Sequence, residues 1–591
     1  MASTESKTDA VAEHGDVAQI EAGSLPGHEK INISGVTAVH RNEIPEGYYK
    51  SWTFIGTFAA ICINSACAYA SFGFPTNLLS IINEDLGPNP NYVWISLVWT
   101  TSSTVVFAVG GRLSDLFGRR WYFIVGNVLG FIGSIFASQA QTIPQLIGAS
   151  VFIGLAAGVQ QMWPMAVDEL VPNRDRGIVN AIVWLTALPF SVFSPVIARS
   201  LYTNTAAGWR GCYYIAMAMS VTATVLFFVF YHPPTFQQLR AAETRQVSKL
   251  QMLDIGGLIL LSSGLVCFLL GISWGGNQYP WKSGQVIGCI VGGVALLAAF
   301  GLYEVFHEQP YPLIPMRLFT NLPYMGYIIS AALITLNYYN ISILWPMQSA
   351  VVYPTSIVGI GWLSTTTGGG ALLGDLVACS LIRPLPKHRW QTVFYAVMGT
   401  IFTAGLAATD SGSRSMAVAF VILSCFAVGA IEAMAYTLAP LLCAPEDIGL
   451  ALGVMLTART FIPSISTAIY LSVLGSKLST NIPKYVIPAA TNAGLPASEL
   501  PGLITGLGTG NFSGIAGITP GIISASTVAY QTAYTKTFKL IYLSTIAWGG
   551  AGIIFSLFSA NMEAKLDDTV ERRLHGKEIT ALTDKAPITS A

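Results

Sequence analysis

The sequence predicts an all-α integral membrane protein with 14 transmembrane helices. Only 10% of its 591 residues are Asp, Glu, Lys or Arg, and 52% are hydrophobic. The mean hydropathy is +0.57. A typical soluble domain carries about 25% charged residues. This chain therefore has too few charges to cover a water-exposed surface, and we expect most of it to lie in a lipid bilayer.

Apolar segments of roughly 20 residues recur along the chain, and this is the length that crosses a bilayer core of about 30 Å. Pro189 and Pro195 interrupt the fifth segment, and we expect the glycines at 368–370 to break the tenth. We expect the fourteen segments to begin near Ser51, Tyr92, Trp121, Gln145, Ile178, Cys212, Leu253, Gly284, Tyr324, Gly359, Gln391, Ser415, Leu450 and Leu540.

The chain divides at its polar stretches. Residues 1–50 are acidic and contain no apolar run, so we interpret them as a disordered cytoplasmic tail without a signal peptide. Residues 561–591 form a second cytoplasmic tail. The predicted membrane parts are a six-helix bundle at 51–231, inserted helices 7 and 8 with their linkers at 232–323, and a second six-helix bundle at 324–560 with a long outer loop at about 475–539.

Lys and Arg predict the orientation. An even number of spans leaves both tails on one side of the membrane. If that side is cytoplasmic, 21 Lys and Arg residues lie inside and 8 lie outside, as positive inner loops require. We expect a multi-pass protein of the plasma membrane with both termini in the cytoplasm.

Several function classes lack their motifs. The 30 basic residues balance the 30 acidic ones, which argues against nucleic-acid binding. The chain has no GxxxxGK[ST] loop and no HExxH, and its eight cysteines suggest no disulfide framework. We therefore expect no enzyme activity, no cofactor and no metal. A secondary transporter, acting as a monomer, fits better.

A short loop between the second and third predicted spans carries the strongest local motif. It reads G-R-L-S-D-L-F-G-R-R over 111–120. This loop resembles the G-x-L-x-D-x-x-G-R-R signature of the major facilitator superfamily. The resemblance implies a gate at the cytoplasmic face, where Asp115 pairs with a nearby arginine; a merely topogenic basic loop is the alternative. The candidate gating residues are Gly111, Arg112, Asp115, Gly118, Arg119 and Arg120.

A wider resemblance covers roughly 49–560. It rests on the segments 168–177, 209–210, 231–236, 274–281, 485–495 and 517–521. Together these segments look like the fungal fourteen-span group that contains trichothecene efflux pumps and siderophore-iron transporters. The resemblance implies proton-coupled export of a toxic secondary metabolite or xenobiotic. Uptake of ferric siderophores with protons is the alternative, and a non-transporting nutrient sensor is a reading from a different class.

The chain departs from the wider superfamily at the positions through which many drug exporters couple to protons. Ala66 stands near the place of an Asp in the first span, Ser150 replaces an Arg in the fourth, and Ser194-Pro195 replaces a Gly-Pro pair in the fifth. Coupling through those groups cannot be carried over to this chain.

Three ionisable residues lie inside predicted spans: Asp375, Glu432 and Arg459. Ionisable groups in a membrane are costly and are therefore candidates for function. We expect Glu432 to accept a proton under the influence of Arg459. A structural ion pair between two helices is an equally good reading.

Polar and aromatic residues within spans suggest a cavity for a small amphipathic organic substrate. Ordinary helix packing is the alternative for each aromatic residue. In the outer loop, Asn511-Phe512-Ser513 matches the pattern for N-glycosylation at Asn511. The candidate cavity residues are Asn64, Gln160, Gln161, Trp184, Asn337, Tyr338 and Asn340.

Overall fold

The computed structural model describes residues 37–40, 47–233, 254–276, 278–307, 312–353, 355–444, 447–509 and 511–572. The predicted disorder of most of 1–50 and the polar tail from 573 onward lie outside these residues. The linker at 234–253 between the sixth and seventh predicted spans also lies outside them.

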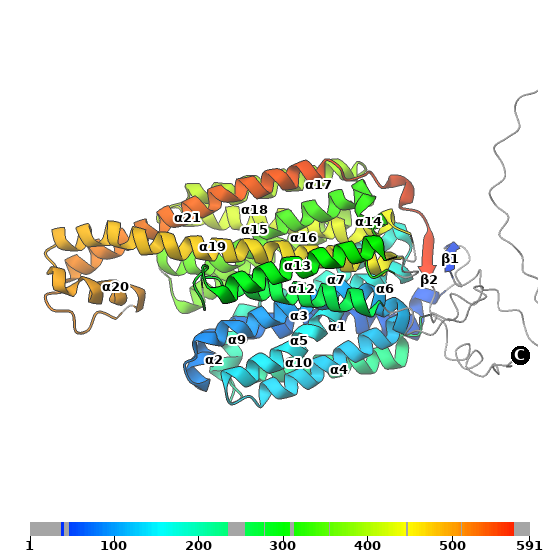
Figure 1. Cartoon of the computed structure of the whole chain (residues 1–591), viewed down its shortest axis with the longest axis horizontal. Coiled ribbons are helices and arrows are strands. Elements are labelled where there is room, and N and C mark those ends of the chain that lie inside the picture. The colour runs from blue at the N-terminus through cyan, green and yellow to red at the C-terminus, as the bar shows by residue number, and fades with distance from the viewer. Residues whose placement is uncertain are drawn as a thin grey trace, which may run out of the picture.

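The described chain is almost entirely helical (Figure 1). Twelve of its helical segments are long and apolar enough to cross a membrane. In chain order the main helices are α1 (Trp52–Thr76), α3 (Trp94–Phe117), α4 (Arg119–Ser138), α5 (Ile143–Gln161), α6 (Trp163–Leu170), α10 (Arg210–Phe230), α12 (Ile255–Trp274), α13 (Gly284–Phe306), α15 (Leu322–Val352), α16 (Ile357–Leu381), α17 (His388–Gly405), α18 (Arg414–Leu438), α19 (Ile448–Asn492) and α21 (Pro520–Ser556). Shorter helices include α2 (Leu79–Leu86), α14 (Arg317–Thr320) and α20 (Leu500–Thr509).

The fifth predicted span is broken where its prolines stand. It consists of α7 (Arg176–Thr186), α8 (Leu188–Ser191) and α9 (Ser194–Asn204), with Pro189 and Pro195 each in the first turn of a new helix. Proline lacks a backbone N–H, which an interior helical position needs and a first turn does not.

The prediction that the tenth span is broken at its glycines was wrong. Helix α16 runs without interruption, and its glycines serve close packing instead. A methyl group on Gly370 would lie 2.7 Å from the carbonyl oxygen of Ile422, and one on Gly374 would overlap that of Phe426. Glycine lets α16 and α18 approach backbone to backbone, as in other tightly packed membrane helices.

The helices pack in two sets. In the first, α1, α4, α5 and α10 pack against one another and α3 packs against α5. In the second, α15, α18, α19 and α21 form a connected group that also includes α16 and α17. The sets meet where α3 packs on α19 and α7 packs on α16, and α12 and α13 pair beside α3 (Figure 1).

The last two long helices extend well past the rest of the molecule. Helix α19 has 45 residues and α21 has 37. At 1.5 Å per residue they span about 68 Å and 56 Å, against about 30 Å of hydrocarbon. The prediction of a long outer loop at about 475–539 and of a last span starting near Leu540 was therefore wrong, because α19, α20 and α21 form a helical projection there (Figure 1).

This projection has a small core of its own. Buried apolar side chains from α19, α20 and α21 pack together there. Their burial offsets two of the three prolines within α19, Pro483 and Pro488, each of which removes a helical hydrogen bond. The core is formed by Val486, Ala490, Leu495, Leu503, Ile522 and Tyr530.

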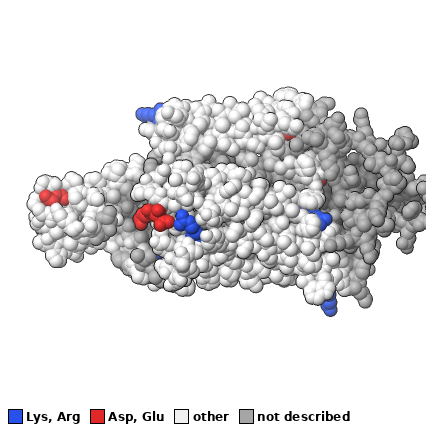
Figure 2. Space-filling model, turned by 90° about the horizontal axis from the view of Figure 1, so that it is seen from below, with Lys and Arg blue, Asp and Glu red and all other residues white. Residues whose placement is uncertain are grey.

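The outer surface between the two ends is apolar. Figure 2 shows one lateral face whose middle is almost free of Lys, Arg, Asp and Glu. Large apolar side chains of the long helices are exposed, including Val291, Leu302 and Trp390, which are 58–61% exposed. Such an extensive apolar surface suits lipid and not water. The chain is a multi-pass membrane protein.

A short antiparallel sheet marks the end opposite the projection. Strand β1 (Thr37–His40) pairs with β2 (Thr569–Arg572), with Val39 opposite Val570. The segment before β2 also lies against the ends of several helices. We call this end of the molecule the β1–β2 end.

Candidate functional site

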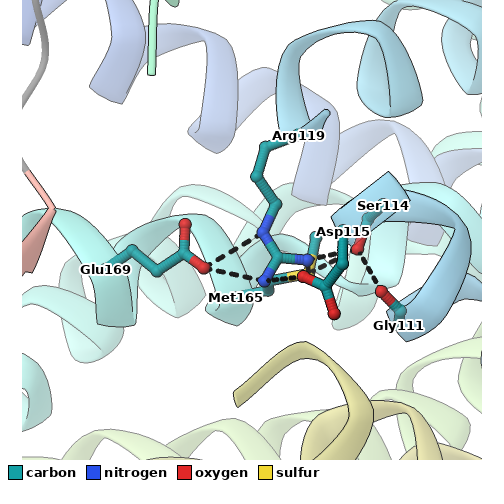
Figure 3. Close-up of polar contacts among 6 residues, drawn as sticks. All are labelled: Gly111, Ser114, Asp115, Arg119, Met165 and Glu169. Carbon is teal, nitrogen blue, oxygen red and sulfur yellow. Dashed lines mark hydrogen bonds and ion pairs between the residues drawn. The ribbon is translucent and has the colours of Figure 1, made fainter. Parts of the chain in front are cut away.

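Arg119 lies at the centre of a buried charge cluster near the β1–β2 end (Figure 3). Its Nη2 is 2.8 Å from Asp115 Oδ1 and 2.7 Å from Glu169 Oε1. Its Nε donates to the same Glu169 oxygen at 3.0 Å. One guanidinium thus faces two carboxylates, which suits its several donors and compensates for the loss of water around the charge.

The same arginine is fixed on its other side by neutral groups. Its Nη1 contacts Ser114 Oγ and lies 2.6 Å from Met165 Sδ. Ser114 in turn donates to the carbonyl oxygen of Gly111 at 2.7 Å (Figure 3). The cluster therefore locks the end of α3, the start of α4 and helix α6 together.

The cluster touches the second set of helices through Gly449. A methyl group there would lie 2.6 Å from Arg119 Nη1. A methyl group on Gly111 would overlap the carbonyl oxygen of Gly449, and one on Gly453 would lie 2.6 Å from Phe107 O. The start of α19 is thus packed directly on α3 at this end, and any larger side chain would separate the two.

The other predicted gating residues lie around this cluster. Gly118 has a φ of 91°, which glycine adopts without strain and which turns the chain from α3 into α4. Arg120 donates to the carbonyl oxygen of Phe228 at 2.6 Å and so ties α4 to α10. Arg112 interacts electrostatically with Glu304 of α13.

The structure brings Glu432 and Arg459 together deep among the helices. Arg459 Nε donates to Glu432 Oε1 at 2.8 Å, and Thr335 Oγ1 donates to the same oxygen at 2.8 Å. The side chains of Arg459 and Glu432 are 12% and 8% exposed. This site joins α15, α18 and α19.

Asp375 of α16 lies near this pair. It is buried and interacts electrostatically with both Glu432 and Arg459. Its Oδ1 makes no hydrogen bond within the described part of the chain. The three predicted ionisable residues therefore form one buried group with two carboxylates and one guanidinium.

Aromatic rings connect this group to the first set of helices. Arg459 lies 5.9 Å from the ring centre of Tyr436, which meets Trp184 edge to face at 5.9 Å. Trp184 also packs on Tyr69 at 5.9 Å and on Trp163 at 5.6 Å. Trp184 thus contacts rings from both sets, and its buried Nε1 has no hydrogen-bond partner among the described residues.

Two of the predicted cavity residues, Asn64 and Gln160, have their amides hydrogen-bonded to neighbouring helices. Asn64 donates to the carbonyl oxygen of Gln160 at 2.8 Å, and Asn127 donates to Asn64 Oδ1 at 2.8 Å. Gln160 completes the network by donating to Asn127 Oδ1 at 2.9 Å. These contacts hold α1, α4 and α5 together, so they favour a packing role for Asn64 and Gln160. Gln161, which follows Gln160 in the chain, is half-buried.

Asn337 and Asn340 of α15 have a different environment. Both are buried, and neither amide makes a hydrogen bond within the described residues. Tyr338 lies between them and is partly exposed. Buried polar groups are normally hydrogen-bonded, so a pair of amides without partners on one helix turn is unusual.

Several residues of these sites were missed from the sequence. Glu169, Asn127, Thr335 and Tyr436 were not predicted as site residues. Glu169 stands in the segment 168–177, where its position after a span could have suggested a gate charge. Within the described residues, no group of three or more His, Cys, Asp or Glu is placed to hold a metal ion.

A comparison with protein families decides the class. Residues 20–584 match the model of the fungal trichothecene efflux pump family, TRI12. The chain belongs to this family. It is 30% identical over 553 residues to the trichothecene efflux pump TRI12 of Trichoderma arundinaceum, with 91% of each chain covered. It is 29% identical over 544 residues to TRI12 of Fusarium sporotrichioides, again with 91% of each covered.

Among solved structures, this chain resembles that of the major facilitator superfamily proton:xylose symporter XylE. The TM-score is 0.54 at 12% identity, with 88% of this chain and 98% of that chain covered. This likeness establishes a major facilitator fold for the chain. The relatives are named as efflux pumps, and they lend no support to siderophore import.

Proposed function

We propose that this protein exports a trichothecene or a closely related amphipathic metabolite in exchange for protons, by alternating access. The named function of its relatives and the coverage of both chains support the substrate class. The buried group of Asp375, Glu432 and Arg459 supports the coupling to protons.

The observation that carries proton coupling is the charge balance of this group. Two carboxylates and one guanidinium leave one negative charge unbalanced when all are ionised. A buried unbalanced charge is expensive, so one carboxylate gains by binding a proton. Arg459 bonds to Glu432, and Asp375 has an oxygen without a partner. Asp375 is therefore the first acceptor.

Transfer of Arg459 between the two carboxylates gives a transport step. Passage of that proton from Asp375 to Glu432 would weaken the charge-assisted bond of Glu432 to Arg459 and leave an ionised Asp375 for Arg459 to contact. Arg459 lies over Tyr436, and Tyr436 contacts Trp184. A move of Arg459 therefore alters the contacts along the seam, by which we mean the boundary between the two helix sets. Substrate export and proton entry then depend on the same contacts.

The substrate site lies along the same seam. Trp184 supplies an aromatic surface and a buried N–H, and Asn337 and Asn340 supply amides. Trichothecenes are uncharged fused-ring molecules with oxygen atoms that accept hydrogen bonds. Apolar walls with a few polar groups are typical of sites for such ligands.

The architecture of the proposed transporter has fourteen spans, because α7–α9 and α16 complete the twelve apolar segments. The residues 51–231 and 324–560 form its two six-helix bundles, with α12 and α13 inserted between them. The β1–β2 end is cytoplasmic, so the Arg119 cluster is the inner gate and is closed. The protein is a plasma-membrane monomer. Asn511, exposed on the outer projection, is glycosylated.

The test compares two cargoes. The chain is expressed in a yeast strain that lacks its own drug exporters, and retention of a labelled trichothecene and uptake of a labelled ferric siderophore are measured in parallel. We expect toxin retention to fall, and to rise again when a protonophore removes the proton gradient. Unchanged toxin retention with increased siderophore uptake would reverse the assignment.

A matched control variant separates the effect of losing Glu432 from the effect of a changed protein level. Glu432→Gln removes one carboxylate of the buried group, whereas Glu499→Gln alters a carboxylate of the outer projection. Only Glu432→Gln should abolish the pH dependence of toxin export at equal protein levels.

A further inference from the structure

The segment that follows the last long helix crosses from one helix set to the other. Residues 561–572, which we call the brace, run along the β1–β2 end (Figure 1). The apolar side chains of Met562 and Val570 are buried there, so the brace is packed against the protein and does not trail away from it.

One part of the brace is fixed to the second helix set. Glu563 Oε1 accepts the backbone N–H of Lys387 at 2.5 Å, and Asn561 Oδ1 accepts that of Arg389 at 3.2 Å. Lys565 Nζ donates to the carbonyl oxygen of Leu441 at 2.8 Å. These contacts reach the start of α17 and the end of α18.

The next part is fixed to the first helix set. Arg174, between α6 and α7, donates its backbone N–H to Asp567 O at 3.0 Å. Its guanidinium lies 2.7 Å from Asp568 Oδ1, and the neighbouring Asn173 donates to Asp567 Oδ1 at 2.8 Å. Strand β2 then pairs with β1, which precedes α1 in the chain.

The connection between these two attachments is very short. Lys565 binds one helix set, Asp567 binds the other, and Leu566 alone stands between them. Two steps along the backbone span at most about 7.6 Å. The two helix sets therefore cannot separate at this end by more than a few ångströms while both attachments hold.

We propose that the inner face of the two helix sets is a docking surface for this chain's own brace, and that the brace must detach from one set each time this end opens. The proposal rests on the alternating access proposed above, but not on the identity of the substrate or on proton coupling. The brace thus holds the transporter closed at the β1–β2 end and limits its rate of opening.

The reactivity of a native cysteine can be used to detect detachment of the brace. Cys443 is half-buried and lines a cavity of about 210 Å³ together with Ala564, Lys565 and Asp567 of the brace. Burial raises the pKa of its thiol to about 12. Because the thiolate is the reactive form, Cys443 should react slowly with a maleimide while the brace is docked, and faster once it detaches.

The experiment measures the rate at which a maleimide labels Cys443 in the full chain in lipid nanodiscs, by mass spectrometry of its peptide. Arg174→Glu weakens one attachment and Glu563→Ala the other, and each should raise the rate by up to about fivefold. The exchange Arg174→Asp with Asp568→Arg should restore the slow rate. Lys484→Glu, on the outer projection, is a remote control for charge reversal and should leave the rate unchanged.

The outcomes separate the possible failures. Equal labelling rates for the unaltered protein, Arg174→Glu and Glu563→Ala would overturn the proposal. A fast rate in the exchanged pair would also overturn it, because a misfolding effect of Arg174→Glu would not be corrected by Asp568→Arg. Labelling needs no substrate, so absent toxin export with a normal labelling response would reject the proposed function and leave the brace intact.

Discussion

Gly111 of α3 and Gly449 of α19 lie so close that a methyl group on Gly111 would overlap the carbonyl oxygen of Gly449. These two glycines belong to different helix sets and stand beside the Arg119 cluster. The two helix sets are therefore in backbone contact at the β1–β2 end, and the buried charges lie directly beside that contact.

Enlarging a glycine at this crossing should prevent closure. Gly453→Ala would place a methyl group 2.6 Å from Phe107 O, and relief of such overpacking costs about 1–3 kcal/mol. We expect export to fall and Cys443 labelling to rise. Gly292→Ala in α13 is the matched control, because a methyl group there meets nothing within 4 Å. Equal behaviour of the two variants would contradict this role for the crossing.

Removing the charge of Glu432 should abolish the pH dependence of export. Glu432→Gln removes the hydrogen-bonded partner of Arg459, and Asp375 alone then balances its charge, so the fold should lose about 1–3 kcal/mol of stability. The double variant Glu432→Gln with Arg459→Gln removes both charges and should recover most of that stability without recovering pH dependence. Export by reconstituted protein at several pH values, with thermal melting, measures both effects. Normal pH dependence in Glu432→Gln would disprove the coupling role.

Two asparagines should respond in opposite ways to loss of the amide. Asn127→Leu breaks the network with Asn64 and Gln160 and should destabilise the protein by about 1–3 kcal/mol. Asn337→Leu removes an amide without a partner, so stability should not fall. If the amide binds substrate, KM should rise by roughly tenfold. An unchanged KM for Asn337→Leu would remove it from the substrate site.

The indole N–H of Trp184 gives a further test of the substrate site. Trp184→Phe keeps an aromatic ring but removes the buried N–H, so we expect a higher KM for an oxygen-rich substrate with a small loss of stability. Trp184→Ala should instead destabilise the protein by about 3–5 kcal/mol. Trp163→Phe, a similar change in the adjoining ring, serves as the control. Identical KM values in the two Phe variants would argue against a ligand at Trp184.

Features that depend on one stretch of chain were predictable. The apolar lengths predicted the helices, and Pro189 and Pro195 predicted the breaks between α7, α8 and α9. Glu432 and Arg459 stood out because both are ionisable residues within apolar runs, and the structure pairs them at 2.8 Å.

Features that depend on neighbouring helices were missed. The glycines at 368–370 suggested a break, yet Gly370 allows α16 to pack on α18 and Gly368 allows it to pack on Ser191. Asn64 and Gln160 read as cavity residues, yet Asn127 lies between them and completes their hydrogen bonds. Composition cannot distinguish these alternatives, because a polar or small residue within a span serves packing and binding equally well.

The sequence by itself determined that this chain crosses a membrane many times and which few charges lie inside it, since hydrophobic length and the cost of burying charge are properties of each segment. Only the tertiary structure decided which charges of the chain meet. Arg119 pairs with Glu169, which is 50 positions away in the sequence, and Arg174 pairs with Asp568, which is 394 positions away. Such pairings follow from the way whole helices pack, which no local pattern records.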